Sequence, residues 1–79
     1  MLTTGNQLRA ARALAGMDQG TLAERAGVNI NTIGSMEKKG PETLTSGLDK
    51  VKAVMAVLEA EGIEFLNHGQ PGVRMRKQA

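Results

Sequence analysis

The sequence contains no cysteine, tryptophan or tyrosine, and Phe65 is its one aromatic residue. Without cysteine the chain forms no disulfide, thiolate zinc site or thiol nucleophile, and this suits a reducing cytoplasm. The shortage of aromatic side chains argues against nucleic-acid binding by base stacking, as on RRM or OB-type surfaces. The one histidine, His68, stands in a glycine-rich stretch with no second ligand nearby, so we expect a solvated loop residue and no metal site.

Long apolar runs and catalytic groupings are missing as well. The longest apolar run, Ala53–Leu58, is far shorter than the roughly 20 residues that span a membrane, and the N-terminus shows no targeting segment, so we expect no membrane association. Glu59, Glu61 and Glu64 lie near one another, but no histidine or aspartate is spaced to complete a metal site or an acid–base pair. We predict a protein that is not an enzyme, has no catalytic residues and holds no cofactor.

The charge is small but unevenly distributed. The 79 residues have room for one small core and carry a formal net charge of +2. Residues 1–40 hold five basic and three acidic groups, residues 41–69 hold two and five, and residues 70–79 hold three and none. An acidic middle between basic ends fits one face turned to a polyanion and another used for packing. An ordinary solvated surface with a basic tail fits the same charges equally well.

Three helices are expected in the first half of the chain, over residues 5–15, 19–26 and 30–37, because apolar residues recur there at helical spacing. Each begins at a side chain that can accept a hydrogen bond from the first turn. Glycine follows the first two helices, where a left-handed residue is favoured. The capping residues are Thr4 with Gln7 in a capping box, Asp18 and Asn29, and the glycines are Gly16 and Gly27.

The second half is expected to hold one long helix followed by a hairpin. An apolar stripe predicts a helix from near Ser46 to about Glu61, with Thr43–Thr45 as a separate short turn, for four to five helices in all. Apolar and charged residues then alternate over Ile63–Phe65 and Val73–Arg76, on either side of a glycine- and proline-containing loop. The predicted fold class is therefore mainly α, a compact helix-turn-helix bundle with a C-terminal β-hairpin.

Pairing residue 63 with 75 and residue 65 with 73 places the apolar side chains of the hairpin on one face and sets Glu64 opposite Arg74. A lone two-stranded hairpin is marginal in water, so this face must be covered by the long helix or by a second copy of the chain. Addition of a strand to a partner's edge would also pair exposed backbone groups. We hypothesise that residues 63–76 form or complete a two-fold interface, and we divide the chain into residues 1–62 and a dimerisation element, 63–79. The predicted interface side chains are Ile63, Phe65, Val73 and Met75.

The strongest pattern lies in residues 19–37, where two short helices meet at a glycine turn. The small side chain of Ala23 lets the second helix approach closely, and Gly27 permits a positive φ. At these residues the sequence resembles the phage-repressor and Cro-type helix-turn-helix family, and with the preceding helix the resemblance covers residues 5–40. The matching positions are Gln19, Leu22, Ala23, Gly27, Val28, Thr32, Ile33 and Glu37.

This resemblance implies that the third helix enters the DNA major groove, with Asn31 pairing with adenine and Ile30 packing on a thymine methyl. No arginine stands between Arg25 and Arg74, so guanine readout by arginine is not expected from this helix. Ile30 and Gly34 stand where polar, often basic, residues are common in the family. Gly34 either allows close approach to DNA or has no role. The DNA-binding residues implied are Gln19, Asn29, Ile30, Asn31, Ser35, Lys38 and Lys39, with Arg9 as a further phosphate contact.

The same resemblance implies a structural ion pair between Arg12 and Glu37. It also implies the function of a sequence-specific regulator of transcription, a repressor or switch that binds a palindromic operator as a homodimer in the cytoplasm, associated with the nucleoid. The alternative is a protein-interaction module on the same fold, antitoxin-like or antiactivator in role. The basic tail, Arg74–Lys77, either reaches DNA phosphates or keeps a sheet edge soluble.

Overall fold

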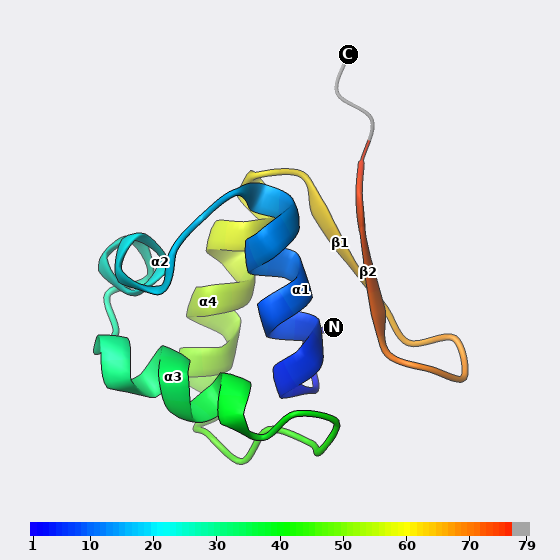
Figure 1. Ribbon diagram of the computed structural model, residues 1–79, viewed down its shortest axis with the longest axis horizontal. Helices are drawn as coiled ribbons and strands as arrows, with labels where there is room; N and C mark the ends of the chain where they lie inside the picture. Colours follow the sequence, from blue (N-terminus) through cyan, green and yellow to red (C-terminus); the bar gives the residue numbers. More distant parts are fainter. Residues whose placement is uncertain (77–79) are drawn as a thin grey trace.

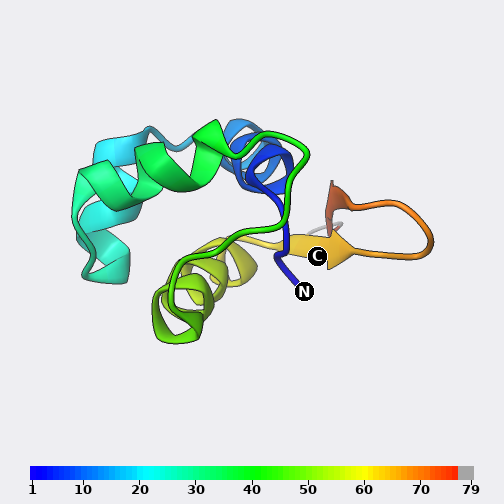
Figure 2. The ribbon, with the colours of Figure 1, turned by 90° about the horizontal axis from the view of Figure 1, so that it is seen from below.

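The computed structural model describes residues 1–76, which form four α-helices and one two-stranded antiparallel hairpin (Figure 1). The elements are α1 (Gly5–Ala15), α2 (Gln19–Ala26), α3 (Ile30–Lys38), α4 (Leu48–Ala60), β1 (Ile63–Leu66) and β2 (Gly72–Met75). In Figure 1, α1 and α4 lie between the α2–α3 pair and the hairpin, and in the perpendicular view of Figure 2 the hairpin lies on the side of the molecule opposite α2. The predicted fold class is confirmed. Within residues 1–76, no helix has the length and apolar character needed to cross a membrane.

The first three helices begin where their capping residues predict. The Thr4 hydroxyl accepts a hydrogen bond from the Gln7 N–H, and the Gln7 side-chain oxygen accepts one from the Thr4 N–H, both at 3.1 Å. The side chains of Asp18 and Asn29 accept from backbone N–H groups in the first turns of α2 and α3. α3 runs one residue beyond its predicted end, to Lys38. Local side-chain chemistry thus fixes these helix starts.

The segment that leads into α4 is extended. Thr43 pairs with Thr4 in an isolated antiparallel bridge, and the Leu44 N–H donates to the Thr3 carbonyl at 2.8 Å. The prediction of a separate turn at Thr43–Thr45 is therefore wrong, because these backbone groups pair with the N-terminal segment. The predicted helix near Ser46–Glu61 also proves shorter than expected, since α4 begins at Leu48 and ends at Ala60.

One apolar core joins the helices and the hairpin. α1 contacts α3 and α4 as well as both strands, so it lies at the centre of the packing. The largest fully buried side chains come from the N-terminal segment, all four helices and β1, and they are Leu2, Leu8, Leu22, Ile33, Met36, Val54, Leu58 and Ile63.

The hairpin has the predicted register and packs on its own chain. Its paired residues are Ile63 with Met75, Glu64 with Arg74, Phe65 with Val73 and Leu66 with Gly72. Ile63 is 1% exposed, and Phe65 and Val73 pack against the core from partly buried positions. The helices of the same chain therefore cover most of the apolar hairpin face. The last three residues of the predicted element 63–79 lie outside the described residues.

The basic tail makes contacts within the hairpin region. The Arg74 guanidinium forms the predicted cross-strand ion pair with the Glu64 carboxylate. Arg76 donates from its guanidinium to the Glu59 carbonyl at 3.1 Å, while Lys77 lies outside the described residues. Both described arginines are thus attached to the hairpin or to the end of α4.

Candidate nucleic-acid interface

The crossing of α2 and α3 is fixed by a glycine turn and by buried apolar side chains on both helices. Gly27 has φ 70°, in the left-handed region, and the Val28 N–H donates to the Ala23 carbonyl at 3.0 Å. Leu22 and Ile33 are completely buried. Because the core holds these side chains, α3 keeps one side inward and presents the other to solvent.

The solvent-facing side of α3 carries short polar groups and one exposed aliphatic residue. Ile33, Met36 and Glu37 occupy the buried side. Ile30 is 49% exposed, and Asn31, Ser35 and Lys38 are also exposed. We define the outward face of α3 as Ile30, Asn31, Gly34, Ser35 and Lys38.

A hollow of about 490 Å³ lies along this outward face, between α3 and the residues Arg9 of α1 and Gln19 of α2. We call it the α3 hollow. It brings together six of the eight predicted DNA-binding residues, and its complete lining is Arg9, Gln19, Ile30, Asn31, Gly34, Ser35, Glu37 and Lys38. The tertiary structure thus gathers groups from three helices on one surface.

The two remaining predicted residues lie outside the hollow. The Asn29 side chain accepts a hydrogen bond from the Asn31 N–H at 2.7 Å, so its oxygen is occupied in capping α3. Lys39 is half-buried just after the end of α3. Both lie beside the outward face without belonging to it.

Lys50, which no pattern in the sequence marks as a candidate, also lies beside α3. A second hollow, of about 460 Å³, borders the other flank of α3 and is lined by Asn31, Thr32, Ser35, Ser46, Gly47 and Lys50. Lys50 belongs to the acidic middle segment, and no local signal in the sequence connects it with α3. Only the folding of the chain brings the start of α4 beside that helix.

Glu37 forms the predicted ion pair with Arg12 at the base of the α3 hollow. Arg12 donates from Nε to Glu37 Oε2 at 2.6 Å and from Nη2 to Oε1 at 3.0 Å. Gln19 donates from Nε2 to Glu37 Oε1 at 3.2 Å, and Arg9 Nε lies 3.7 Å from the same oxygen. The Glu37 side chain is 2% exposed, whereas that of Arg9 is 65% exposed. Arg12 is therefore committed to the carboxylate, and Arg9 keeps most of its guanidinium open to solvent.

The contacts of Glu37 keep it ionised. Burial by itself raises the pKa of Glu37, but hydrogen bonds from Arg12 and Gln19 and the charges of Arg12 and Arg9 outweigh burial, so the pKa lies below its ordinary value. The hydrogen bond to Glu37 in turn raises the pKa of Arg12. The buried negative charge is thus compensated locally, and Arg9 and Lys38 leave the rim of the hollow cationic.

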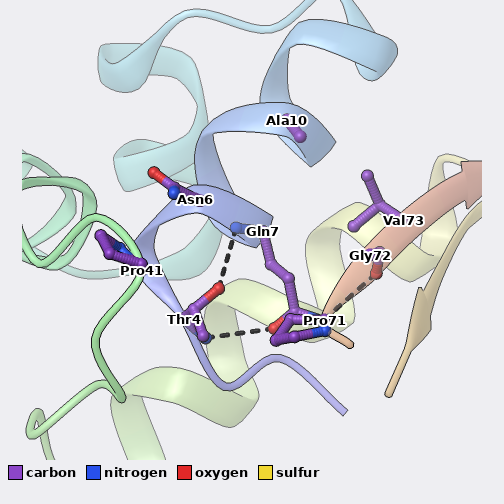
Figure 3. A pocket seen from close by; sticks show the side chains of 8 residues that line it. All are labelled: Thr4, Asn6, Gln7, Ala10, Pro41, Pro71, Gly72 and Val73. Carbon is purple, nitrogen blue, oxygen red and sulfur yellow. Dashed lines mark hydrogen bonds between the residues drawn. The ribbon is translucent and has the colours of Figure 1, made fainter. Parts of the chain in front are cut away.

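A third hollow, of about 310 Å³, lies away from α3, between the N-terminal half of α1 and β2 (Figure 3). Gln7 lies along it and donates from Nε2 to the carbonyls of Leu66 and Gly72 at 3.1 and 3.2 Å. The side chains of Ala10 and Val73 border it from the two elements. None of the residues that line it is ionisable, so it offers no group for acid–base chemistry.

Neither the scan against protein-family models nor the search of curated proteins finds a match for this chain.

Proposed function

We propose that the protein is a sequence-specific DNA-binding regulator of transcription, a repressor or switch that places α3 in the major groove. The observation that carries this proposal is the outward face of α3, which exposes Asn31, Ser35 and Ile30 on the side of the helix opposite its buried residues. The major groove admits an α-helix, and short amide, hydroxyl and aliphatic side chains are suited to base edges there.

The charges around this face support the same proposal. Arg9 and Lys38 lie at the rim of the α3 hollow, and Lys50 lines the neighbouring hollow. The one acidic group lining either hollow, Glu37, is paired with Arg12. Cations that flank a base-reading surface are suited to phosphate oxygens, which set the position of a protein on DNA.

We propose further that the protein binds DNA as a homodimer, since a two-fold dimer places two α3 helices on the two halves of a palindromic operator. The free edge of β2 supports this part of the proposal. The Arg76 N–H donates to the Gly62 carbonyl at 2.7 Å, and hydrogen-bonded pairs alternate along an antiparallel ladder. With the observed register, the backbone groups of Val73 and Met75 therefore point away from β1, where a partner strand could pair with them.

The edge of β2 is a better candidate for the dimer contact than the apolar face of the hairpin, because most of that face is buried within the chain. Of the four predicted interface side chains, Ile63 is in the core and Met75, at 38% exposed, is the most open to a partner. The hollow beside β2 that is bordered by Ala10 leaves room for side chains of an added strand (Figure 3).

DNA binding is tested by selecting preferred sequences from a random double-stranded pool and measuring affinity at several salt concentrations. The Asn31→Ala/Ser35→Ala double variant should bind the selected operator at least about tenfold more weakly, because it loses the polar base contacts. Gln70→Ala, which removes an exposed amide from the hairpin loop, is the control and should bind normally.

Affinity should fall steeply with salt, and the Arg9→Ala and Lys38→Ala variants should each reduce the salt slope by about one. If the double variant and the wild type bound the operator equally well, α3 would not be the helix that reads the base edges. Failure to enrich any DNA, together with salt-insensitive binding of a protein partner, would favour the protein-interaction alternative.

Dimerisation is tested by analytical ultracentrifugation of a matched pair of variants at micromolar concentrations. Met75→Pro removes an N–H that faces away from β1, and proline is tolerated at such edge positions. This variant should be monomeric with an intact fold, whereas Met75→Ala, which keeps the N–H, should remain a dimer. A monomeric wild-type protein, or a dimeric Met75→Pro variant, would contradict pairing through the β2 edge.

A further inference from the structure

The third hollow, between α1 and β2, is enclosed by three separate parts of the chain, and we call it the α1–β2 hollow. Asn6 and Ala10 belong to α1, Pro41 follows α3, and Pro71 and Val73 belong to the hairpin (Figure 3). Its volume of about 310 Å³ lies at the lower end of the range of roughly 300–1,000 Å³ that is common for small-molecule sites. The hollow therefore suits a compound that consists of one ring with a short substituent.

Gln7 holds the walls of this hollow together. Its side chain is 2% exposed, and it accepts hydrogen bonds from the Thr3 and Thr4 N–H groups while donating to the Leu66 and Gly72 carbonyls. These contacts join the start of α1 to both strands, so the hollow exists without a ligand. Because the polar atoms of Gln7 are already paired, a ligand must use other groups of the lining.

Two other polar side chains of the lining have hydrogen-bonding capacity left. Thr4 is 5% exposed, and its hydroxyl oxygen accepts from the Gln7 N–H, but none of residues 1–76 accepts the hydroxyl hydrogen. The Asn6 carboxamide is exposed and forms no hydrogen bond within the same part of the chain. A ligand amide is complementary to these groups, since its oxygen can accept from Thr4 or Asn6 and its N–H can donate to the Asn6 oxygen.

The rest of the lining is apolar. The rings of Pro41 and Pro71 lie on different sides of the hollow, and Ala10 and Val73 add methyl groups (Figure 3). Proline rings pack well on aromatic rings, as in the recognition of proline-rich segments by aromatic-lined grooves. No lining residue is ionisable, so a charged ligand would lose hydration without gaining an ionic partner. The lining therefore favours an aromatic ring without charge.

We propose that the α1–β2 hollow binds a small, uncharged aromatic amide, and that this ligand weakens the dimer contact at β2. The second part rests on the proposed homodimer, because side chains of an added strand would use the same hollow. The strand and the ligand then exclude one another, so ligand binding favours the monomer. Since a monomer presents one α3 helix instead of two, the ligand acts as an inducer that releases the operator.

Benzamide is the probe that tests the ligand site, and its controls are benzoate and benzamidine, which have nearly the same size but carry a negative and a positive charge. In NMR titrations of the full chain, benzamide should shift the backbone amide signals of Asn6, Ala10 and Val73 with a dissociation constant of about 1 mM, as expected for a ligand of this size. Benzoate and benzamidine should bind at least about tenfold more weakly, because the hollow holds no charge to pair with them.

A matched pair of variants locates the site. Ala10→Leu fills part of the hollow and should weaken benzamide binding at least about tenfold. Ala13→Leu adds the same side chain about one turn further along α1, at an exposed position outside the hollow, and should bind benzamide normally. Thermal melting checks that both variants fold. Absence of the expected shifts, equally tight binding of a charged analogue, or unchanged binding by Ala10→Leu would overturn the ligand site.

Analytical ultracentrifugation with and without benzamide tests the effect on the dimer. Benzamide should raise the monomer fraction of the wild type. A dimer that persisted unchanged while benzamide shifted the three amide signals would overturn the effect on dimerisation and leave the ligand site standing. A wild type that is monomeric without benzamide would overturn the proposed dimer and the effect on it together, while the NMR titration decides the ligand site independently.

Discussion

Arg12 of α1 and Glu37 of α3 are joined by two hydrogen bonds, at 2.6 and 3.0 Å, through a carboxylate that is almost completely buried. Arg12 also donates to the Met17 carbonyl at 3.1 Å, so one guanidinium connects α1, the α1–α2 turn and α3. This pair holds the C-terminal end of α3 against α1. The direction in which the outward face points therefore depends on an electrostatic contact as well as on apolar packing.

Removal of Glu37 should destabilise the protein strongly. In Glu37→Ala the guanidinium of Arg12 loses its partner in a largely buried site, and the free energy of unfolding should fall by about 3 kcal/mol. Glu64→Ala is the matched control, because it breaks the more exposed pair with Arg74 and should lower stability by less than about 1 kcal/mol. Urea denaturation of both variants measures the difference. Similar losses in the two variants would contradict a special role for the buried pair.

The lowered pKa of Glu37 predicts a loss of stability in acid. A carboxylate whose pKa is lower in the folded than in the unfolded chain stabilises the fold above its unfolded pKa, near 4.5. This stabilisation is lost as the pH falls through the lower, folded-state value. The midpoint of urea unfolding should therefore fall more steeply below pH 4.5 in the wild type than in Glu37→Gln. The pKa of Asp18 is also lowered, by a hydrogen bond from the Thr21 N–H, and this effect is common to both proteins. If the unfolding midpoint fell equally steeply with pH in both, Glu37 would not be the cause of the acid sensitivity.

Alanine substitutions at helical glycines should have opposite effects at two positions. Gly34→Ala should raise the free energy of unfolding by up to about 1 kcal/mol, since the methyl group meets open space and alanine favours the helix. Gly5→Ala should lower it, because the methyl group would clash with the backbone of α3 at Met36. Gly20→Ala, where only ordinary contacts arise, should not be destabilising. Thermal and urea unfolding of the three variants would rank them, and a stabilised Gly5→Ala variant would contradict the packing described.

The hydrogen bonds of the Gln7 side chain should stabilise the packing of the hairpin on α1. It donates to the Leu66 and Gly72 carbonyls and accepts from the Thr3 and Thr4 N–H groups. Gln7→Leu leaves these groups without their partner, and the free energy of unfolding should fall by about 2 kcal/mol or more.

Hydrogen exchange should show the loss of Gln7 first in the amides of β1 and β2. Gln70→Leu, at an exposed loop position, should change stability by no more than about 0.5 kcal/mol and leave the exchange unaltered. Uniform loss of protection across the helices in Gln7→Leu would indicate a general weakening of the core instead of release of the hairpin.

Several features of this protein follow from the sequence by itself. The capping box of Thr4 and Gln7, the caps at Asp18 and Asn29, and the left-handed Gly27 depend on residues only a few positions apart, and their chemistry dictates where the helices start and end. The hairpin register follows from the two-residue alternation around Phe65, because a shift by one residue would turn the apolar side chains outward. The pairing of Arg12 with Glu37 followed from the resemblance, and the structure confirms it.

Tertiary structure decided the features that depend on packing between distant segments. Thr43 could have formed a turn, but its pairing with Thr4 makes this segment extended. The apolar hairpin face could have met a partner or its own helices, and burial of Ile63 in the shared core selected the latter. The position of Lys50 beside α3 also has no local cause. Local sequence sets each element, but the free energy of burying apolar surface between elements determines which side chains remain exposed.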